Sequence, residues 1–260
     1  MNSLKMNKFF RYVILIIIFL LLIYDLPNIN KFVEYLISVV KYPYVFSMTE
    51  NENMLAINGL LNNQNVYSMS GNGTNYYLVY PPLFHLISAL FSKIFGLTIL
   101  IPRIISIVSL ISLGVVLFNF FKHKMRVWEN LLITFLLFSF TLNIANYAKY
   151  YILARADMLA FALAFGSLFF IWQIIYQQNN SKTNYMLAGA LALCAFLTKQ
   201  SIIFPFIVLI LSTFLSPDRK GWLKFLVYLV ATSAVALILI QLVTGGQFWP
   251  SMILASQVYG

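Results

Sequence analysis

The sequence predicts an all-α, polytopic membrane protein with about seven transmembrane helices, organised as a single domain over residues 1–260. Hydrophobic residues make up 61% of the chain and charged residues only 9%, whereas a soluble domain carries about half apolar and about a quarter charged residues. Several apolar runs approach the roughly 20 residues that a spanning helix needs. The basic residues stand in short clusters between these runs, which is typical of topology signals and not of a nucleic-acid interface.

The first apolar run, 9–24, follows a cluster of basic residues. It predicts a retained signal-anchor helix with its N-terminus in the cytoplasm. A secretory signal peptide would begin in the same way, but Asp25-Leu-Pro-Asn follows the run where a small-residue cleavage site would stand. We expect the mixed stretch 25–97 to form an outer-face loop that carries amphipathic helices.

The remaining spans are predicted at 98–121, 127–147, 158–176, 185–198, 201–215 and 222–243. Segment 83–95 is too short to span and is expected to lie flat in the outer interface or to be partly re-entrant. With this choice, and with the two shortest runs as a hairpin, the clusters around Lys122, Lys182 and Arg219 all fall on the cytoplasmic side. The chain then ends on the outer side within a loop, so we expect it to be the front part of a longer protein.

This topology places several ionisable residues at a similar depth, near the outer ends of the helices. A charge at the bilayer centre costs about 2.5–3.5 kcal/mol on insertion scales. Several charges at one membrane boundary therefore favour a polar cavity or a bound ligand. The residues concerned are Glu50, Glu52, Arg103, Arg155, Asp157 and Lys199.

The two glutamates have a structural interpretation as well as a functional one. Thr49-Glu-Asn-Glu52 fits a helix capping box, with Thr49 as the N-cap and Glu52 as its partner, which leaves Glu50 available for chemistry. Ser47-Met-Thr-Glu50 fits the same template, and the local sequence does not choose between the two.

The other polar residues of this face also allow two interpretations. Asp157 opens its span, where the carboxylate caps the helix, pairs with Arg155 or takes part in chemistry. Lys199 and Gln200 interrupt a long apolar stretch, in which a lysine either extends to the headgroups or faces an anionic group. Two further residues serve either as membrane-interface anchors or as contacts to a sugar or phosphate, namely Tyr80 and Arg103.

Four of these features follow one another in a characteristic order: Glu50 before an amphipathic run, Tyr80-Pro-Pro-Leu before an arginine-bearing span, Arg155-Ala-Asp-Met, and Leu197-Thr-Lys-Gln between two short spans. In this order the chain resembles the GT-C glycosyltransferases, in the branch of the protein O-mannosyltransferases and the lipid A aminoarabinose transferase. Such enzymes are usually about twice as long. The chain also departs from the pattern, since Thr49 stands where an Asp-Glu pair is common and the stretch before Pro81 lacks a lysine found in some members.

The resemblance implies a sugar donor carried on polyprenyl phosphate and an acceptor hydroxyl on a protein, lipid or glycan. It implies that Glu50 takes the acceptor proton, that Asp157 orients the acceptor or shares the base role, and that Lys199 stabilises the departing phosphate. The remaining substrate-binding residues it implies are Glu52, Tyr80, Arg103, Arg155 and Gln200. No nucleotide cofactor is needed, although some relatives use a divalent cation. The two histidines, His85 and His123, lie far apart, and the only cysteine is Cys194, so the residues themselves predict no metal site.

Two rival functions remain at the level of the sequence. A transporter or flippase of a lipid-linked sugar usually shows internal repeats and ionisable groups near the midplane, and neither pattern is found here. A non-catalytic membrane subunit or an inactive fragment is the other alternative. We expect a location in the cell membrane of a prokaryote, with the active site on the extracytoplasmic side.

Overall fold

Helices dominate the chain, and no strand occurs among the residues that the structure describes, which confirms the predicted all-α fold. The structure is a computed structural model, and it describes residues 8–67, 78, 80–122, 126–143, 152–177, 181–215 and 219–259. The helices are α1 Lys8–Lys41, α2 Met48–Leu61, α3 Leu83–Phe95, α4 Leu100–Phe121, α5 Val127–Asn143, α7 Asp157–Tyr176, α8 Lys182–Thr198, α9 Phe204–Leu215, α10 Arg219–Val243 and α11 Phe248–Tyr259.

Within the described residues, four helices are long and apolar enough to cross a membrane: Tyr12–Lys41 of α1, and all of α4, α7 and α10. The prediction of a polytopic membrane protein is therefore confirmed. The helices α8 and α9, with 17 and 12 residues, are shorter than the roughly 20 that a span needs. They meet at a break over residues 199–203, where the hairpin was expected. The span predicted at 127–147 begins with α5 and runs past the described residues after Asn143.

The first helix is longer than the sequence predicted, because α1 runs past the expected end at Tyr24 to Lys41. The polar residues after Tyr24 indicated a loop, but the apolar residues beyond Pro27 recur at the helical period and pack against α4 and α7. These apolar residues are Phe32, Tyr35, Leu36 and Val39. The first part of the predicted outer-face segment 25–97, residues 25–41, thus continues the helix of the first span.

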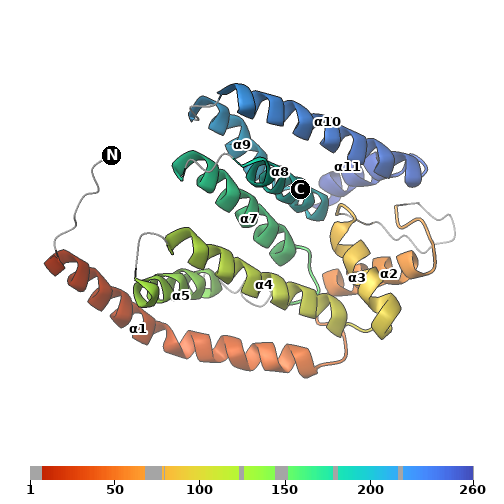
Figure 1. The fold of residues 1–260 in the computed structure, drawn as a ribbon. Helices are drawn as coiled ribbons and strands as arrows, with labels where there is room; N and C mark the ends of the chain where they lie inside the picture. The colour runs from red at the N-terminus through yellow and green to blue at the C-terminus, as the bar shows by residue number, and fades with distance from the viewer. Residues whose placement is uncertain are drawn as a thin grey trace.

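Helix α7 lies between α4 and α8 in the middle of the bundle (Figure 1). The helices α4 and α7 run in the same direction, because Ser106 contacts Arg155 near their starts and Phe120 contacts Phe169 near their ends. Helix α8 runs the opposite way, since its last turn meets the first turn of α7 through an ion pair. The starts of α4 and α7 and the end of α8 thus come together.

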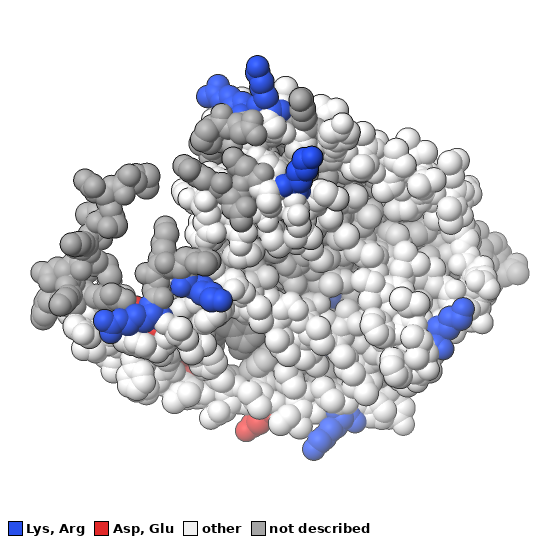
Figure 2. Space-filling model, in the orientation of Figure 1, with Lys and Arg blue, Asp and Glu red and all other residues white. Residues whose placement is uncertain are grey.

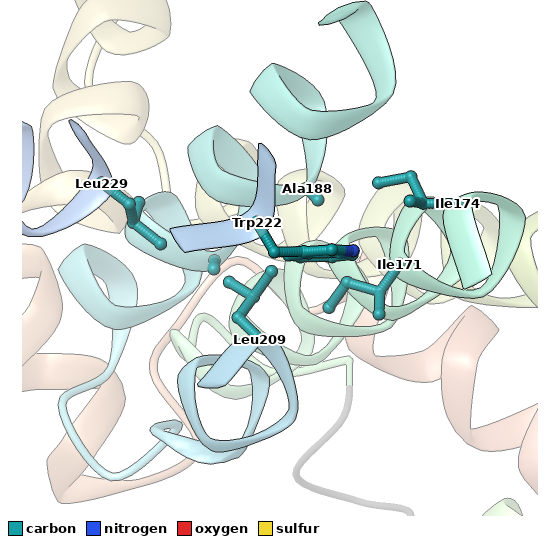
Figure 3. Close-up of a cluster of buried hydrophobic side chains, with 7 residues drawn as sticks. Ile171, Ile174, Ala188, Leu209, Trp222 and Leu229 are labelled. Atoms are coloured by element: carbon teal, nitrogen blue, oxygen red, sulfur yellow. The ribbon is translucent and has the colours of Figure 1, made fainter. Parts of the chain in front are cut away.

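A buried apolar cluster joins α7, α8, α9 and α10 away from that end (Figure 3). Trp222 of α10 is fully buried in it, between Ile174 of α7 and Leu209 of α9. Gly189 allows α8 to approach α10 closely, because a Cβ atom at this position would lie 2.7 Å from Cζ of Phe225. Tight packing here joins α8 to α10.

The two ends of the bundle differ in structure and in charge. The helices α2, α3 and α11 lie beside the end where α4 and α7 begin (Figure 1). The exposed basic residues at the opposite helix ends are Lys122, Arg126, Lys182, Arg219 and Lys220. Lys41 and Lys93 are exposed at the ends of α1 and α3, and Figure 2 shows blue groups at several places on a mostly white surface. Helix α3 has the predicted bounds, 83–95, and its 13 residues are too few to span. The segment after Gln247, expected to be a loop, forms α11.

Candidate functional site

Glu50 and Arg103 form an ion pair in which both side chains are 0% exposed. The Nε and Nη2 groups of Arg103 donate to the two carboxylate oxygens at 2.9 and 2.8 Å. The guanidinium also donates to backbone carbonyl oxygens at distances of 2.8, 2.6 and 2.7 Å, those of Val39, Tyr42 and Tyr44. The pair therefore joins α2 and α4 to the end of α1 and the residues that follow it.

The Glu50 carboxylate accepts two further hydrogen bonds. Its Oε1 accepts from the Ala154 N–H at 2.8 Å, and its Oε2 accepts from the Phe46 N–H at 2.7 Å. Burial raises the pKa of Glu50, but the hydrogen bonds that it accepts, led by those from Arg103, outweigh burial and hold the pKa below its usual value. A general base needs a free lone pair and a pKa near the working pH. In this structure Glu50 is therefore suited to a structural role.

The helix that carries Glu50 begins at Ser47. Ser47 is the N-cap of α2, and its Oγ accepts from the Glu50 N–H at 3.2 Å. The capping box based on Thr49 is therefore wrong, and the alternative based on Ser47 is the one adopted. Glu52 lies half-buried, and its carboxylate has no hydrogen bond or ion pair with the described part of the chain. Burial raises the pKa of Glu52. The sequence suggested a structural role for Glu52 and a free carboxylate for Glu50, and the structure shows the reverse.

Asp157 lies in a half-buried charge cluster at the start of α7. Its carboxylate pairs with Nζ of Lys199 at the end of α8 and with Nε of Arg155 at 3.3 Å, and all three side chains are between 19% and 21% exposed. Nζ of Lys199 also lies 5.4 Å from the centre of the Tyr80 ring, within the range of a cation–π interaction. The N-cap residue of α7, Ala156, makes no capping bond. Because two cations surround one carboxylate, the cluster carries a net positive charge and can receive another anion.

The expectation that Glu50 and Asp157 line one polar cavity does not hold for Glu50, which is enclosed by protein. The two residues are linked through the backbone instead, since Ala154, which donates to Glu50, precedes Asp157 by three positions. The next carbonyl, that of Arg155, accepts from Oγ of Ser106 at 3.1 Å. The predicted residues thus form two neighbouring units: the buried Glu50–Arg103 pair and the open cluster around Asp157.

Tyr80 and Gln200 lie at the border of the open cluster. The Tyr80 carbonyl accepts from the Tyr67 hydroxyl at 3.0 Å, and the Tyr67 carbonyl accepts from Oγ of Ser251 at 2.8 Å. Gln200 follows Lys199 in the break between α8 and α9 and is half-buried. The backbone of Tyr80 is thereby fastened to α11, while its ring faces Lys199.

Sequence reasoning missed two polar residues beside the Glu50–Arg103 pair, Asn53 and His85. Nδ2 of Asn53 donates to the Ala154 carbonyl at 2.7 Å, and its Oδ1 lies 2.8 Å from Nε2 of His85. Asn53 follows Glu50 by three residues and so shares its face of α2, which is the one signal that the sequence offered. Nothing in the local sequence indicates that Glu50 and Asn53 both contact Ala154, which lies about a hundred positions away.

An apolar groove of about 1090 Å³ runs between α3, α4 and α7. Residues from Leu100 to Asn119 of α4 line it, which corresponds to about 28 Å of helix and approaches the roughly 30 Å of a hydrocarbon core. Leu159 lines the end nearest the charge cluster and lies in the first turn of α7, as Asp157 does. Other lining residues are Phe91, Ile104, Val108, Ser112, Leu163 and Phe169. The groove therefore reaches the level of Asp157 along α7, although Arg155, Asp157 and Lys199 are not among the residues that line it.

Comparisons of the chain with protein-family models, with curated proteins and with solved structures find no match. In the part of the chain that the structure describes, no group of three His, Cys, Asp or Glu side chains is arranged to hold a metal ion. His123 lies outside the described residues. The function of the site therefore has to be inferred from its own residues and their geometry.

Proposed function

We propose that this chain is the membrane part of a glycosyltransferase that moves a sugar from a polyprenyl-phosphate donor to an acceptor hydroxyl on the extracytoplasmic side. One observation carries the proposal: a net positive, half-buried cluster lies in the same first turn of α7 as Leu159, which lines an apolar groove almost as long as a hydrocarbon core is thick. A polyprenyl-phosphate sugar combines the same two parts, an apolar chain and an anionic head. The order of the sequence motifs agrees with this assignment through their resemblance to GT-C enzymes.

In the proposed complex, the polyprenyl chain lies in the groove and the phosphate contacts Lys199 and Arg155. In this structure Lys199 donates a charge-assisted hydrogen bond to the Asp157 carboxylate, and Arg155 forms an ion pair with it. An incoming phosphate competes for them and frees Asp157. Donor binding and the exposure of a base are thereby coupled at one cluster.

The transfer itself is a single displacement. The acceptor oxygen attacks the anomeric carbon, the bond from that carbon to the phosphate oxygen breaks, and the electron pair stays on the polyprenyl phosphate. The acceptor proton passes to a carboxylate, and the two cations stabilise the negative charge that develops on the leaving group. We assign the proton to Asp157 and not to Glu50, because Arg103 and two backbone N–H groups occupy the Glu50 oxygens.

Binding of a long-chain polyprenyl phosphate tests the donor site without knowledge of the sugar, because every donor of this class leaves that product. The purified full chain in lipid nanodiscs is titrated with the lipid, and bound lipid is measured by native mass spectrometry. We expect Lys199→Ala to weaken binding about tenfold or more, the loss of a charge-assisted contact, and the exposed Lys93→Ala to leave it unchanged. Equal affinity in the two variants would contradict the assignment of Lys199.

The groove is tested with a matched pair of neighbouring residues on α4. Ser112 lines the groove, whereas Ile111 lies outside it and is 60% exposed. We expect Ser112→Trp to fill the groove and to lower polyprenyl-phosphate binding strongly, while Ile111→Trp has little effect. Farnesyl phosphate, which is too short to fill the groove, should bind both variants alike.

Turnover is tested with radiolabelled polyprenyl-phosphate hexoses and pentoses in membranes that supply the acceptor, by following the release of polyprenyl phosphate with and without EDTA. We expect Asp157→Asn to lower the rate by about a hundredfold or more, within the range of general-base catalysis, in protein that still binds the lipid. Binding without any release from the wild type would favour the alternative of a lipid-linked sugar transporter.

A further inference from the structure

The segment that leads into Asp157 is held at consecutive peptide groups by side chains from other helices. The Ala154 N–H donates to Glu50 and the Ala154 carbonyl accepts from Asn53. The Arg155 carbonyl accepts from Ser106 of α4. Ile152, Leu153 and Ala154 are all buried. The position of Asp157 is thus set by α2 and α4 as well as by its own helix.

Asn53 is itself oriented by His85. The Nδ2 group of Asn53 donates to the Ala154 carbonyl, so its Oδ1 is the acceptor that faces Nε2 of His85. Nε2 therefore carries the hydrogen. Asn53 is 2% exposed and His85 is 0% exposed. Water cannot replace either partner at that depth, so the direction of the Asn53 amide depends on His85.

We infer that Asn53 and His85 are positioning residues for the Asp157 cluster, an inference that rests on the proposed function. Together they form a relay of two hydrogen bonds from α3 through α2 to the Ala154 carbonyl. The relay fixes the turn from which Asp157 reaches Lys199 and Arg155. Neither residue contacts the substrate in this assignment; each acts through the placement of the Asp157 carboxylate.

A merely structural role for the relay makes a different prediction from a positioning role. A buried hydrogen bond of this kind contributes to stability wherever it lies, so a structural role alone would lower the unfolding temperature and leave the folded site intact. A positioning role also changes the distance between residues 157 and 199 in folded protein. That distance can be measured without any substrate.

Cysteine crosslinking measures this distance directly. Asp157→Cys and Lys199→Cys are combined with Cys194→Ala in the full chain and treated in nanodiscs with a short bifunctional thiosulfonate reagent. We expect Asn53→Leu to lower the crosslinking yield at least threefold. The same substitution at exposed Asn51 on α2, Asn51→Leu, should leave the yield unchanged. Equal yields in the two backgrounds would overturn the inference.

Kinetics and a conservative replacement supply the second readout. His85→Gln keeps an N–H group that can reach Asn53, whereas His85→Phe keeps the ring without a donor. We expect His85→Gln to retain a rate within about threefold of wild type. His85→Phe should lower kcat at least tenfold with the donor KM nearly unchanged, because the phosphate contacts remain.

Equal rates in the two His85 variants would also overturn the inference. A wild type that releases no polyprenyl phosphate counts against the proposed function alone, since the crosslinking result does not depend on turnover.

Discussion

Arg103 is the residue on which most of the buried polar contacts at the site depend. Its guanidinium binds Glu50 and three backbone carbonyl groups, those of Val39, Tyr42 and Tyr44, and lies 5.1 Å from the centre of the Phe46 ring. Removal of one partner from a buried ion pair leaves an uncompensated charge and costs about 3–5 kcal/mol. Replacing Arg103 and Glu50 together removes both charges, so neither is left buried without its partner.

We therefore predict that Arg103→Met destabilises the protein by about 3–5 kcal/mol, and that Glu50→Gln partly reverses this loss in the double variant. Denaturant unfolding of the four proteins in detergent, analysed as a double-mutant cycle, measures the coupling. Lys93→Met, at an exposed position, serves as the control with an expected change within about 0.5 kcal/mol. Additive losses in the double variant would contradict a direct pair.

His85 makes the stability of the fold depend on pH. Burial lowers the pKa of His85 to about 3, against about 6.5 in an unfolded chain. At pH 5 the unfolded state binds a proton that the folded state does not, so stability is complete above about pH 6.5 and falls as the pH drops towards 3. The loss at pH 5 is about 2 kcal/mol.

The corresponding measurement compares unfolding temperatures at pH 7.5 and pH 5 in wild type and in His85→Gln. Glutamine does not titrate, so we expect the variant to lose less stability than the wild type between the two values. Titration of His123 is common to both proteins and cancels in the comparison. A drop of the same size in both would show that His85 is protonated in the folded state.

At the scale of elements, the contact between α8 and α10 depends on a residue without a side chain. A Cβ atom at Gly189 would lie 2.7 Å from Cζ of Phe225 and 3.2 Å from Cδ1 of Leu229. We predict that Gly189→Val separates the two helices and destabilises the protein by about 1–3 kcal/mol, as overpacking does. The neighbouring Ala190 is exposed, and Ala190→Val should be nearly neutral. Thermal unfolding of the two variants in detergent compares them, and similar losses would argue against close packing at Gly189.

The sequence predicted elements better where a single physical signal decides their ends. Pro82 and Gly96 bound α3, and its predicted range agrees with the structure. The end of α1 was missed because residues 25–41 mix polar side chains with an apolar stripe, and only the packing partners of Phe32 and Val39 on α4 and α7 make that stripe visible. Tertiary contacts, not local propensity, extend this helix.

The site shows the same division between local and distant information. The positions of the basic clusters and the lengths of the spans predicted that Asp157, Arg155 and Lys199 lie at one end of the bundle. The structure joins these three residues in ion pairs. The choice between Glu50 and Asp157 as the base depends on Arg103 and on the Ala154 N–H. These partners lie 53 and 104 positions from Glu50, and no local pattern encodes such distances.

For the whole molecule, the distribution of charge predicts an orientation in the membrane. The exposed basic residues at the end of α4 and the starts of α8 and α10 favour the cytoplasm for that end. Single cysteines at Gln64 and at Lys122, both exposed, are introduced with Cys194→Ala and treated with an impermeant maleimide on intact cells. We expect the reagent to label Gln64→Cys and not Lys122→Cys. Labelling of Lys122→Cys from outside would reverse the orientation and move the Asp157 cluster to the cytoplasm.

The ion pair between Lys199 and Asp157 also bears on biosynthesis. At 17 and 12 residues, α8 and α9 measure about 26 and 18 Å, so neither reaches across the bilayer, and the lysine between them enters at a depth where a lone charge costs up to about 3 kcal/mol. The ribosome delivers α7 first, so Asp157 is already in place when Lys199 leaves the translocon. We therefore expect the nascent hairpin to meet its counter-charge on the preceding helix, so that α7 assists the insertion of these two short helices.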